Sequence, residues 1–111
     1  ETSDLDVGLL DGTDDSTYLS LLDRHLNEVF ESFQPDFICF QSGVDVLATD
    51  KLGRLGMTLD GCKARDRMVL ELCHRNKVPV MACMGGGYSE KIAHIVEAHA
   101  NTYRLAQELY F

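Results

Sequence analysis

The 111-residue sequence is long enough for one modest domain, and its contents of 45% hydrophobic and 25% charged residues are ordinary for a globular protein. Eighteen acidic residues against ten basic ones give a net charge of −8, which disfavours binding to nucleic acid, because that binding needs basic patches. No apolar run approaches the roughly 20 residues that cross a bilayer, so we expect no membrane partner.

The cysteines predict buried free thiols rather than a disulfide framework or a zinc knot. No Cys-x-x-Cys pair occurs, and each cysteine stands among apolar residues. Free thiols of this kind are typical of a reducing compartment, so we expect a cytoplasmic protein. The four are Cys39, Cys62, Cys73 and Cys83.

The first third of the chain predicts a weak strand and then an amphipathic helix. Residues 6–10 (DVGLL) are a strand candidate that ends at the turn signal Asp11-Gly12. Residues 13–16 (TDDS) supply N-caps, and the helix that follows should end near Gln34-Pro35. The apolar residues at helical spacing are Tyr18, Leu22, Leu26, Val29 and Phe33.

Two continuous apolar runs, residues 37–40 (FICF) and 78–84 (VPVMACM), are typical of parallel strands covered on both faces. Between them, Thr58 or Asp60 can cap a second helix. The inner stripe of that helix is Cys62, Val69, Leu72 and Cys73. A third helix follows Ser89, and its predicted apolar side is Ile92, Ile95, Val96, His99, Tyr103 and Ala106.

Two polar side chains fall on these apolar stripes. His99, on the third helix, is expected to be a hydrogen-bonded core histidine. Asp66, on the second helix, is expected to bond to a backbone N–H or to an arginine, because a buried carboxylate needs a partner.

The alternation of strands and helices predicts an α/β fold with parallel strands and a right-handed crossover. Two strong strands make a poor domain, however, because each parallel strand needs neighbours at its edges and helices on both faces. We therefore interpret residues 1–111, which do not begin with methionine, as the C-terminal portion of a larger α/β domain. The alternative is a small complete domain that dimerises through its sheet.

Two segments follow the strong strands, at the edge where parallel sheets bind ligands. Residues 41–58 are long for a strand-to-helix loop and carry Asp45 and Asp50. Residues 85–89 (GGGYS) follow the second strand, so Asp45 and Tyr88 can face one crevice if the strands are neighbours. Asp45 could be a metal ligand, a general base or a cap. The glycines fit a turn, a catalytic loop or a phosphate cradle, although the usual phosphate-loop patterns are absent.

Several motifs together resemble the zinc-dependent histone deacetylases. Residues 35–61 (PDFICFQSGVDVLATDKLGRLGMTLDG) are similar to the segment that supplies the last metal ligand of that family. GGGYS, followed by AHANTYRLA at residues 98–106, is similar to its closing motif, and DGTDDSTYL at residues 11–19 looks most like the bacterial and class IV branch. The resemblance covers nearly the whole chain and implies the C-terminal part of an arginase-like deacetylase fold, with parallel strands alternating with helices.

The resemblance also implies roles for five residues. Asp45 would complete an Asp-His-Asp zinc site, and Tyr88 would donate a hydrogen bond to the amide oxygen and to the tetrahedral oxyanion. Gly86 and Gly87 would line the acyl-lysine channel and let Tyr88 swing in, and Leu52 would line the mouth of the channel. The implied substrate is acetyl-lysine or a related acetylated amine.

The sequence departs from the family in what it lacks. The aspartate and histidine that complete the zinc site, and the adjacent histidine pair that moves protons, are not among these 111 residues. We therefore expect the intact protein to be a zinc-dependent amide hydrolase, and the isolated chain to be inactive and to self-associate. The alternatives are a nucleotide-binding module that uses Gly85–Gly87 and a non-catalytic assembly piece.

Overall fold

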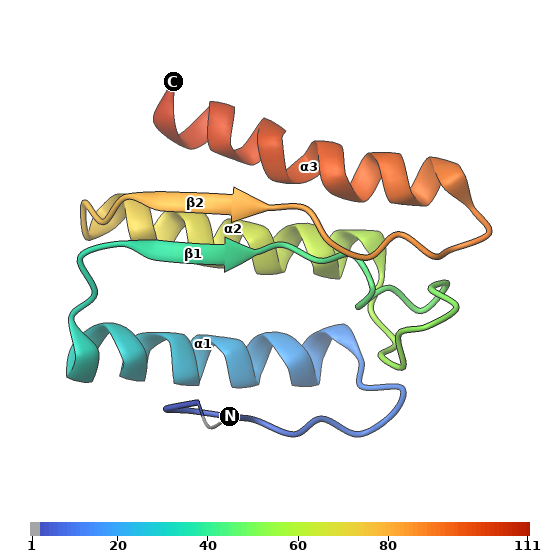
Figure 1. Cartoon of the computed structure of the whole chain (residues 1–111), viewed down its shortest axis with the longest axis horizontal. Helices are drawn as coiled ribbons and strands as arrows, with labels where there is room; N and C mark the ends of the chain where they lie inside the picture. Colours follow the sequence, from blue (N-terminus) through green and yellow to red (C-terminus); the bar gives the residue numbers. More distant parts are fainter. Residues whose placement is uncertain (1–2) are drawn as a thin grey trace.

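The computed structural model describes residues 3–111, which form three helices and two strands in alternation (Figure 1). The elements are α1 (Asp15–Phe33), β1 (Ile38–Gln41), α2 (Leu59–Arg75), β2 (Val80–Cys83) and α3 (Ile92–Tyr110). Helix α2 lies behind the two strands and contacts both α1 and α3. Within the described residues, no helix is long and apolar enough to cross a membrane.

The first helix begins and ends where the sequence predicts. The side chain of Asp14 accepts a hydrogen bond of 2.9 Å from the backbone N–H of Thr17, which caps the helix. Gln34 adopts a left-handed conformation with φ 52° and ends the helix directly before Pro35. No residue of α1 is fully buried, so the apolar stripe of this helix is only partly covered within the described chain.

The predicted strand at residues 6–10 is wrong. The sheet of the described residues contains only β1 and β2, and the segment runs along α1 instead (Figure 1). There, Val7 and Leu9 line a small cavity together with Tyr18 and Leu22 of α1. A strand needs a neighbouring strand to pair its backbone groups, and the neighbour of this segment is a helix.

The two predicted strong strands are confirmed, and they pair in parallel from Ile38 opposite Val80 to Gln41 opposite Cys83. Alternate side chains point to opposite faces. One face, which includes Phe40, packs toward α2, where the guanidinium of Arg65 lies 5.6 Å from the Phe40 ring centre. The other face is exposed and carries two of the four free thiols. Burial is therefore confirmed for Cys62 and Cys73, and the prediction is wrong for Cys39 and Cys83.

The second helix has the cap and the buried stripe that the sequence predicts. Thr58, rather than Asp60, is the N-cap, and its hydroxyl accepts a hydrogen bond of 3.0 Å from the Gly61 N–H. The same hydroxyl donates to the carboxylate of Asp15 at 2.5 Å, which joins the first turns of α1 and α2. The predicted stripe is fully buried, and Leu70 belongs to it as well. The stripe residues are Cys62, Val69, Leu70, Leu72 and Cys73.

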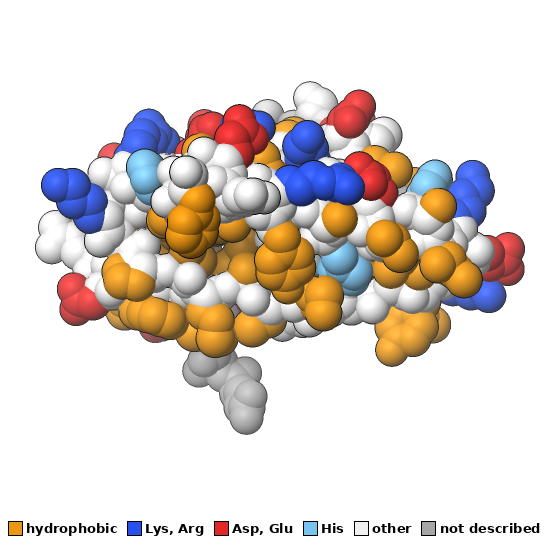
Figure 2. All heavy atoms as spheres, turned by 90° about the horizontal axis from the view of Figure 1, so that it is seen from above, with side chains coloured by type: hydrophobic (Ala, Val, Ile, Leu, Met, Phe, Trp, Pro, Cys, Tyr) orange, Lys and Arg blue, Asp and Glu red, His pale blue; other side chains and the backbone are white. Residues whose placement is uncertain are grey.

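The third helix buries a different side from the predicted one. Its buried residues face α2 and are small or polar, apart from one leucine: Ala98, Asn101, Thr102 and Leu105. The predicted apolar side includes Ile92, Val96 and Tyr103, which are exposed. Figure 2, seen from the α3 side, shows hydrophobic side chains gathered over one half of this face and charged ones along its upper edge.

The prediction of a hydrogen-bonded His99 is also wrong. The side chain is half-buried, and its Nδ1 atom is buried without a hydrogen-bond partner among residues 3–111. His99 belongs to the predicted apolar side of α3, two positions before Asn101, the nearest of the buried polar residues that face α2. The buried polar groups of α3 are satisfied where the helix faces α2 and not on its apolar side.

Candidate active site

The site begins where the paired backbone of β1 continues beyond the strand. The N–H of Ser42 donates to the carbonyl of Cys83 at 2.9 Å, and the N–H of Val44 donates to the carbonyl of Gly85 at 3.0 Å. Val44 is buried in the core, whereas the next residue, Asp45, is exposed. The parallel ladder therefore holds the backbone up to Val44, and Asp45 presents its carboxylate outward at the carboxyl end of the sheet.

The glycine loop passes directly against Asp45. A Cβ atom at Gly86 would lie 2.8 Å from the Asp45 backbone nitrogen and 3.0 Å from the Asp45 Cβ. Gly86 has φ 72° and Gly87 has φ 106°, values that a side chain disfavours. A Cβ at Gly85 would meet the side-chain amide of Gln41 at 2.8 Å. The bare backbone of this loop is what permits its close approach to Asp45.

The N–H groups at the end of the loop are used within the protein. Tyr88 donates its backbone N–H to Asp50 Oδ1 at 3.0 Å, and the backbone N–H of Gly87 also contributes to the environment of that carboxylate. A phosphate cradle needs such N–H groups free to bind an anion. The engagement of the Gly87 and Tyr88 N–H groups by Asp50 therefore argues against the nucleotide-binding alternative.

Asp50 is a buried carboxylate, only 8% exposed, at the centre of this arrangement. Its Oδ2 atom accepts hydrogen bonds from the backbone N–H groups of Leu52 at 3.0 Å and Gly53 at 2.8 Å. Burial alone would raise the pKa of Asp50, but the backbone N–H groups of Gly53, Tyr88, Leu52 and Gly87 outweigh burial and hold its pKa below the ordinary value. Asp50 is therefore a structural anion at neutral pH.

The two remaining candidate residues lie on adjoining loops beside Asp45. Tyr88 is 56% exposed and Leu52 is 69% exposed. The N–H of Lys51 donates to the carbonyl of Tyr88 at 3.3 Å, which brings the two loops together. A Cβ at Gly53 would lie 1.8 Å from the Asp45 carbonyl oxygen, so the residue after Leu52 is in contact with Asp45. All five candidates are thus brought to one end of the sheet.

Sequence reasoning missed Arg65, which is hydrogen-bonded to the backbone two residues before Asp45. Arg65 of α2 donates from Nη1 to the carbonyl of Gly43 at 2.6 Å. Its Nε donates to Asp66 Oδ1 at 2.9 Å, and the Thr102 hydroxyl donates to Asp66 Oδ2 at 2.5 Å. Asp66, which is fully buried, therefore has an arginine partner as predicted. The Arg65-Asp66 dipeptide on a buried helix stripe was the available sequence signal.

The residues that the structure describes do not form a complete metal site. Asp45 offers an exposed carboxylate at the carboxyl end of the sheet, but no group of three or more potential ligands occurs within residues 3–111. The four histidines all lie on helices. They are His25 on α1, His74 on α2, and His94 and His99 on α3.

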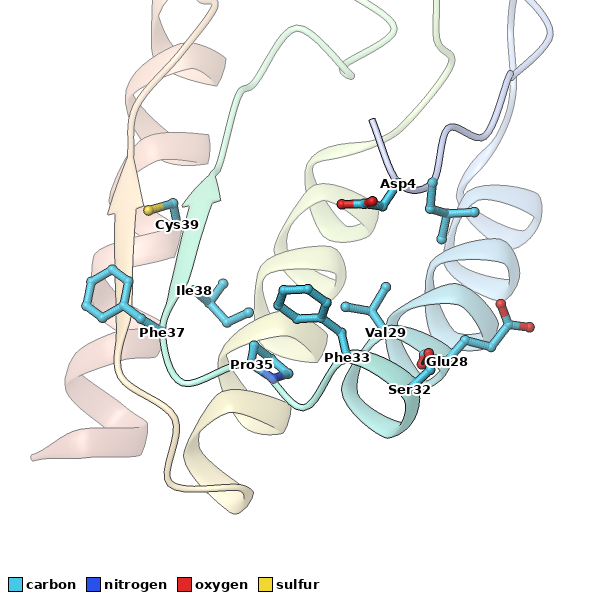
Figure 3. A pocket seen from close by; sticks show the side chains of 10 residues that line it. Asp4, Glu28, Val29, Ser32, Phe33, Pro35, Phe37, Ile38 and Cys39 are labelled. Atoms are coloured by element: carbon cyan, nitrogen blue, oxygen red, sulfur yellow. Dashed lines mark hydrogen bonds between the residues drawn. The ribbon is translucent and has the colours of Figure 1, made fainter. Parts of the chain in front are cut away.

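A mostly apolar cavity lies away from these residues. It has a volume of about 560 Å³ and opens between α1, the N-terminal segment and the start of β1, whereas Asp45 follows the end of that strand. Figure 3 shows Val29 and Phe33 of α1 and Ile38 of β1 around this space. The lining is mostly apolar, and it contains none of the candidate site residues.

Comparisons with known proteins agree with the fold. Residues 1–103 match the family model of the histone deacetylase domain. An uncharacterized protein of Picosynechococcus sp. is 39% identical over 110 residues, which are 99% of this chain and 37% of that protein. Histone deacetylase 2 of Arabidopsis thaliana is 31% identical over 93 residues, which are 84% of this chain and 24% of that protein.

A solved structure shares the fold. The crystal structure of the HDA15 HD domain superposes with a TM-score of 0.72 and 21% sequence identity, over 88% of this chain and 27% of that chain. The chain belongs to the histone deacetylase family. Its fold is part of the arginase-like deacetylase fold, as the motifs predict. The chain spans only about a quarter to two fifths of the length of these relatives.

Proposed function

We propose that the intact protein containing this chain is a zinc-dependent hydrolase that removes acetyl groups from acetyl-lysine or a related acetylated amine. The observation that carries this proposal is the contact between Gly86 and Asp45. This contact brings a carboxylate and the loop of Tyr88 together at the carboxyl end of parallel strands, where such sheets bind ligands. Membership of the histone deacetylase family supports the reaction class.

Asp45 would be one anionic ligand of the zinc. A bound zinc polarises the amide carbonyl and lowers the pKa of a bound water molecule. A catalytic zinc takes three protein ligands, so two more ligands would come from outside residues 3–111. The general base and acid would come from there too. We propose accordingly that residues 1–111 are the C-terminal part of a single deacetylase domain.

Tyr88 would act on the developing negative charge. Tyr88 is exposed, its backbone is bonded to the loop that carries Asp45 and Asp50, and a phenolic O–H can donate a hydrogen bond to an oxyanion. The bare backbone of Gly86 and Gly87 would leave room for a narrow alkyl chain. Leu52, exposed on the adjoining loop, would offer apolar contact to the methylene groups of a lysine side chain.

The test uses the intact protein and the variant Asp45→Asn. Zinc content after dialysis and turnover of an acetyl-lysine peptide should both fall sharply, because the substitution removes an anionic ligand. Asp36→Asn is the matched control, since Asp36 is exposed and precedes the start of β1, whereas Asp45 follows the end of that strand. Unchanged zinc occupancy in Asp45→Asn would refute the ligand assignment, and a wild-type protein with full zinc that hydrolyses neither acetyl-lysine peptides nor other acetylated amines would refute the deacetylase proposal.

A further inference from the structure

The carboxylate of Asp50 joins two loops that are far apart in the sequence. On one side it binds the N–H groups of Leu52 and Gly53, two and three residues ahead. On the other side it binds the N–H of Tyr88, which is 38 residues away. The backbones of Asp50 and Ser89 also form an isolated antiparallel bridge. Asp50 therefore joins the two loops at Tyr88 and at the next residue, Ser89.

This arrangement is more than a local turn. An aspartate that only forms a turn or a helix cap binds N–H groups within two or three residues, as the exposed Asp14 does with Thr17. Asp50 is buried, and both of its oxygens are engaged by backbone N–H groups. An anion held by several backbone N–H groups makes strong hydrogen bonds with fixed directions. Its position therefore fixes the positions of both loops.

Asp50 is also unsuited to bind a metal or substrate. Its oxygens are occupied and its side chain is buried, whereas Asp45 is exposed. The role left for Asp50 is to act through the residues that it holds. One of these is Tyr88, the proposed oxyanion donor, and another is Leu52, at the proposed mouth of the channel.

We propose that Asp50 is a positioning residue for the deacetylase reaction. By fixing the backbone of Tyr88, it sets the reach of the phenol toward the substrate, and by fixing Leu52, it sets the channel mouth relative to that phenol. This inference rests on the proposed function. It adds that a single buried carboxylate coordinates the oxyanion donor with the substrate entrance.

The decisive experiment is a double-mutant cycle in the intact protein with Asp50→Asn and Tyr88→Phe. An asparagine cannot accept hydrogen bonds at both ends, so one of the two loops is released. Asp50→Asn should lower kcat for an acetyl-lysine peptide by about 10- to 100-fold, the loss expected for a hydrogen bond to a charged group, with the zinc content unchanged. In the Tyr88→Phe background the same substitution should have little further effect on kcat.

The cycle separates positioning from general destabilisation. A merely structural role would lower kcat by the same factor in both backgrounds, and that additive result would overturn the positioning role alone. If Tyr88→Phe has the turnover of the wild type, or if the wild type has none, the proposed function fails and the positioning role fails with it. Asp36→Asn is the control for a surface Asp-to-Asn change and should retain wild-type kcat.

A measurement on the wild-type protein covers the case in which Asp50→Asn does not fold. The amides of Tyr88, Leu52 and Gly53 should exchange with deuterium much more slowly than open-loop amides, because each is bonded to the buried carboxylate. Exchange of these amides at open-loop rates would overturn the proposal. Asp50→Glu, which moves the carboxylate by one methylene, is the second variant for the cycle and should show the same coupling to Tyr88.

Discussion

Arg65 of α2 donates a hydrogen bond of 2.6 Å to the carbonyl of Gly43, two residues before Asp45. The same guanidinium pairs with Asp66, whose second oxygen accepts a hydrogen bond from Thr102 of α3. A single buried network therefore connects α2 and α3 to the loop that carries the candidate metal ligand. The candidate site depends on a helix pair that itself contributes no residue to the chemistry.

Arg65→Met should destabilise the fold strongly. The substitution leaves Asp66 as a buried carboxylate without its cation, and breaking a buried ion pair in this way costs about 3–5 kcal/mol. The free energy of unfolding from urea titration of the intact protein measures this loss. Adding Asp66→Asn should recover part of the loss, because the uncompensated charge is then removed. A double variant that loses the sum of the two single effects would contradict this account of the network.

Gly86→Ala should impair the site far more than an alanine at an unhindered glycine such as Gly8. The new Cβ would clash with the Asp45 backbone at 2.8 Å, and φ 72° is strained for alanine. We expect at least a roughly ten-fold loss of kcat/KM and a loss of about 1–3 kcal/mol in stability. Gly8→Ala is the matched control, since a Cβ at Gly8 has no atom within 4 Å. Equal effects of the two substitutions would show that the glycine loop tolerates a side chain.

The boundaries of the helices could be read from local signals. Thr58 caps α2, Asp14 lies within the predicted cap segment of α1, and Gln34-Pro35 ends α1. Each of these features is decided within a few residues of chain, so the sequence pattern suffices. The parallel pairing of β1 and β2 also followed from their continuous apolar character.

Features that depend on distant partners could not be read in this way. The prediction of the buried side of α3 was wrong because Thr102 is polar. The burial of Thr102 depends on its hydrogen bond to Asp66, which is 36 positions away. The sequence showed Asp50 in a long loop, but its bond to Tyr88 spans 38 positions. Asp45 and the glycine loop were placed together correctly, because parallel neighbouring strands bring their carboxyl ends to the same edge.

The contribution of Asp50 to stability should disappear in acid. Its pKa in the folded protein lies below the value of about 3.9 in the unfolded chain, so its stabilising effect is present above that value. This effect is lost as the pH falls from about 4 through the lower pKa of the folded state. The difference in unfolding free energy between wild type and Asp50→Asn should therefore shrink between pH 6 and pH 3. A difference that is independent of pH would contradict a charged Asp50 in the fold.

The reactivity of the cysteine thiols should show which face of the sheet is exposed to solvent in the isolated chain. Cys39 and Cys83 lie on the exposed face, whereas Cys62 and Cys73 are buried in α2, and burial raises the pKa of both buried thiols. Iodoacetamide should therefore modify Cys39 and Cys83 first, as followed by mass spectrometry of peptides. Rapid modification of Cys62 or Cys73 would contradict the packing of α2.

The same reagent tests the proposal that the chain is part of a larger domain. If the rest of that domain covers the sheet, Cys39 and Cys83 should react much more slowly in the intact protein than in the isolated chain, while Cys62 and Cys73 stay slow in both. In the isolated chain, the uncovered sheet and the exposed apolar side of α3 should cause self-association, which light scattering measures. Equal reactivity of Cys39 and Cys83 in both forms would mean that this face of the sheet is uncovered in the intact protein. Zinc-dependent turnover by a monomer of these 111 residues would instead identify a complete small enzyme.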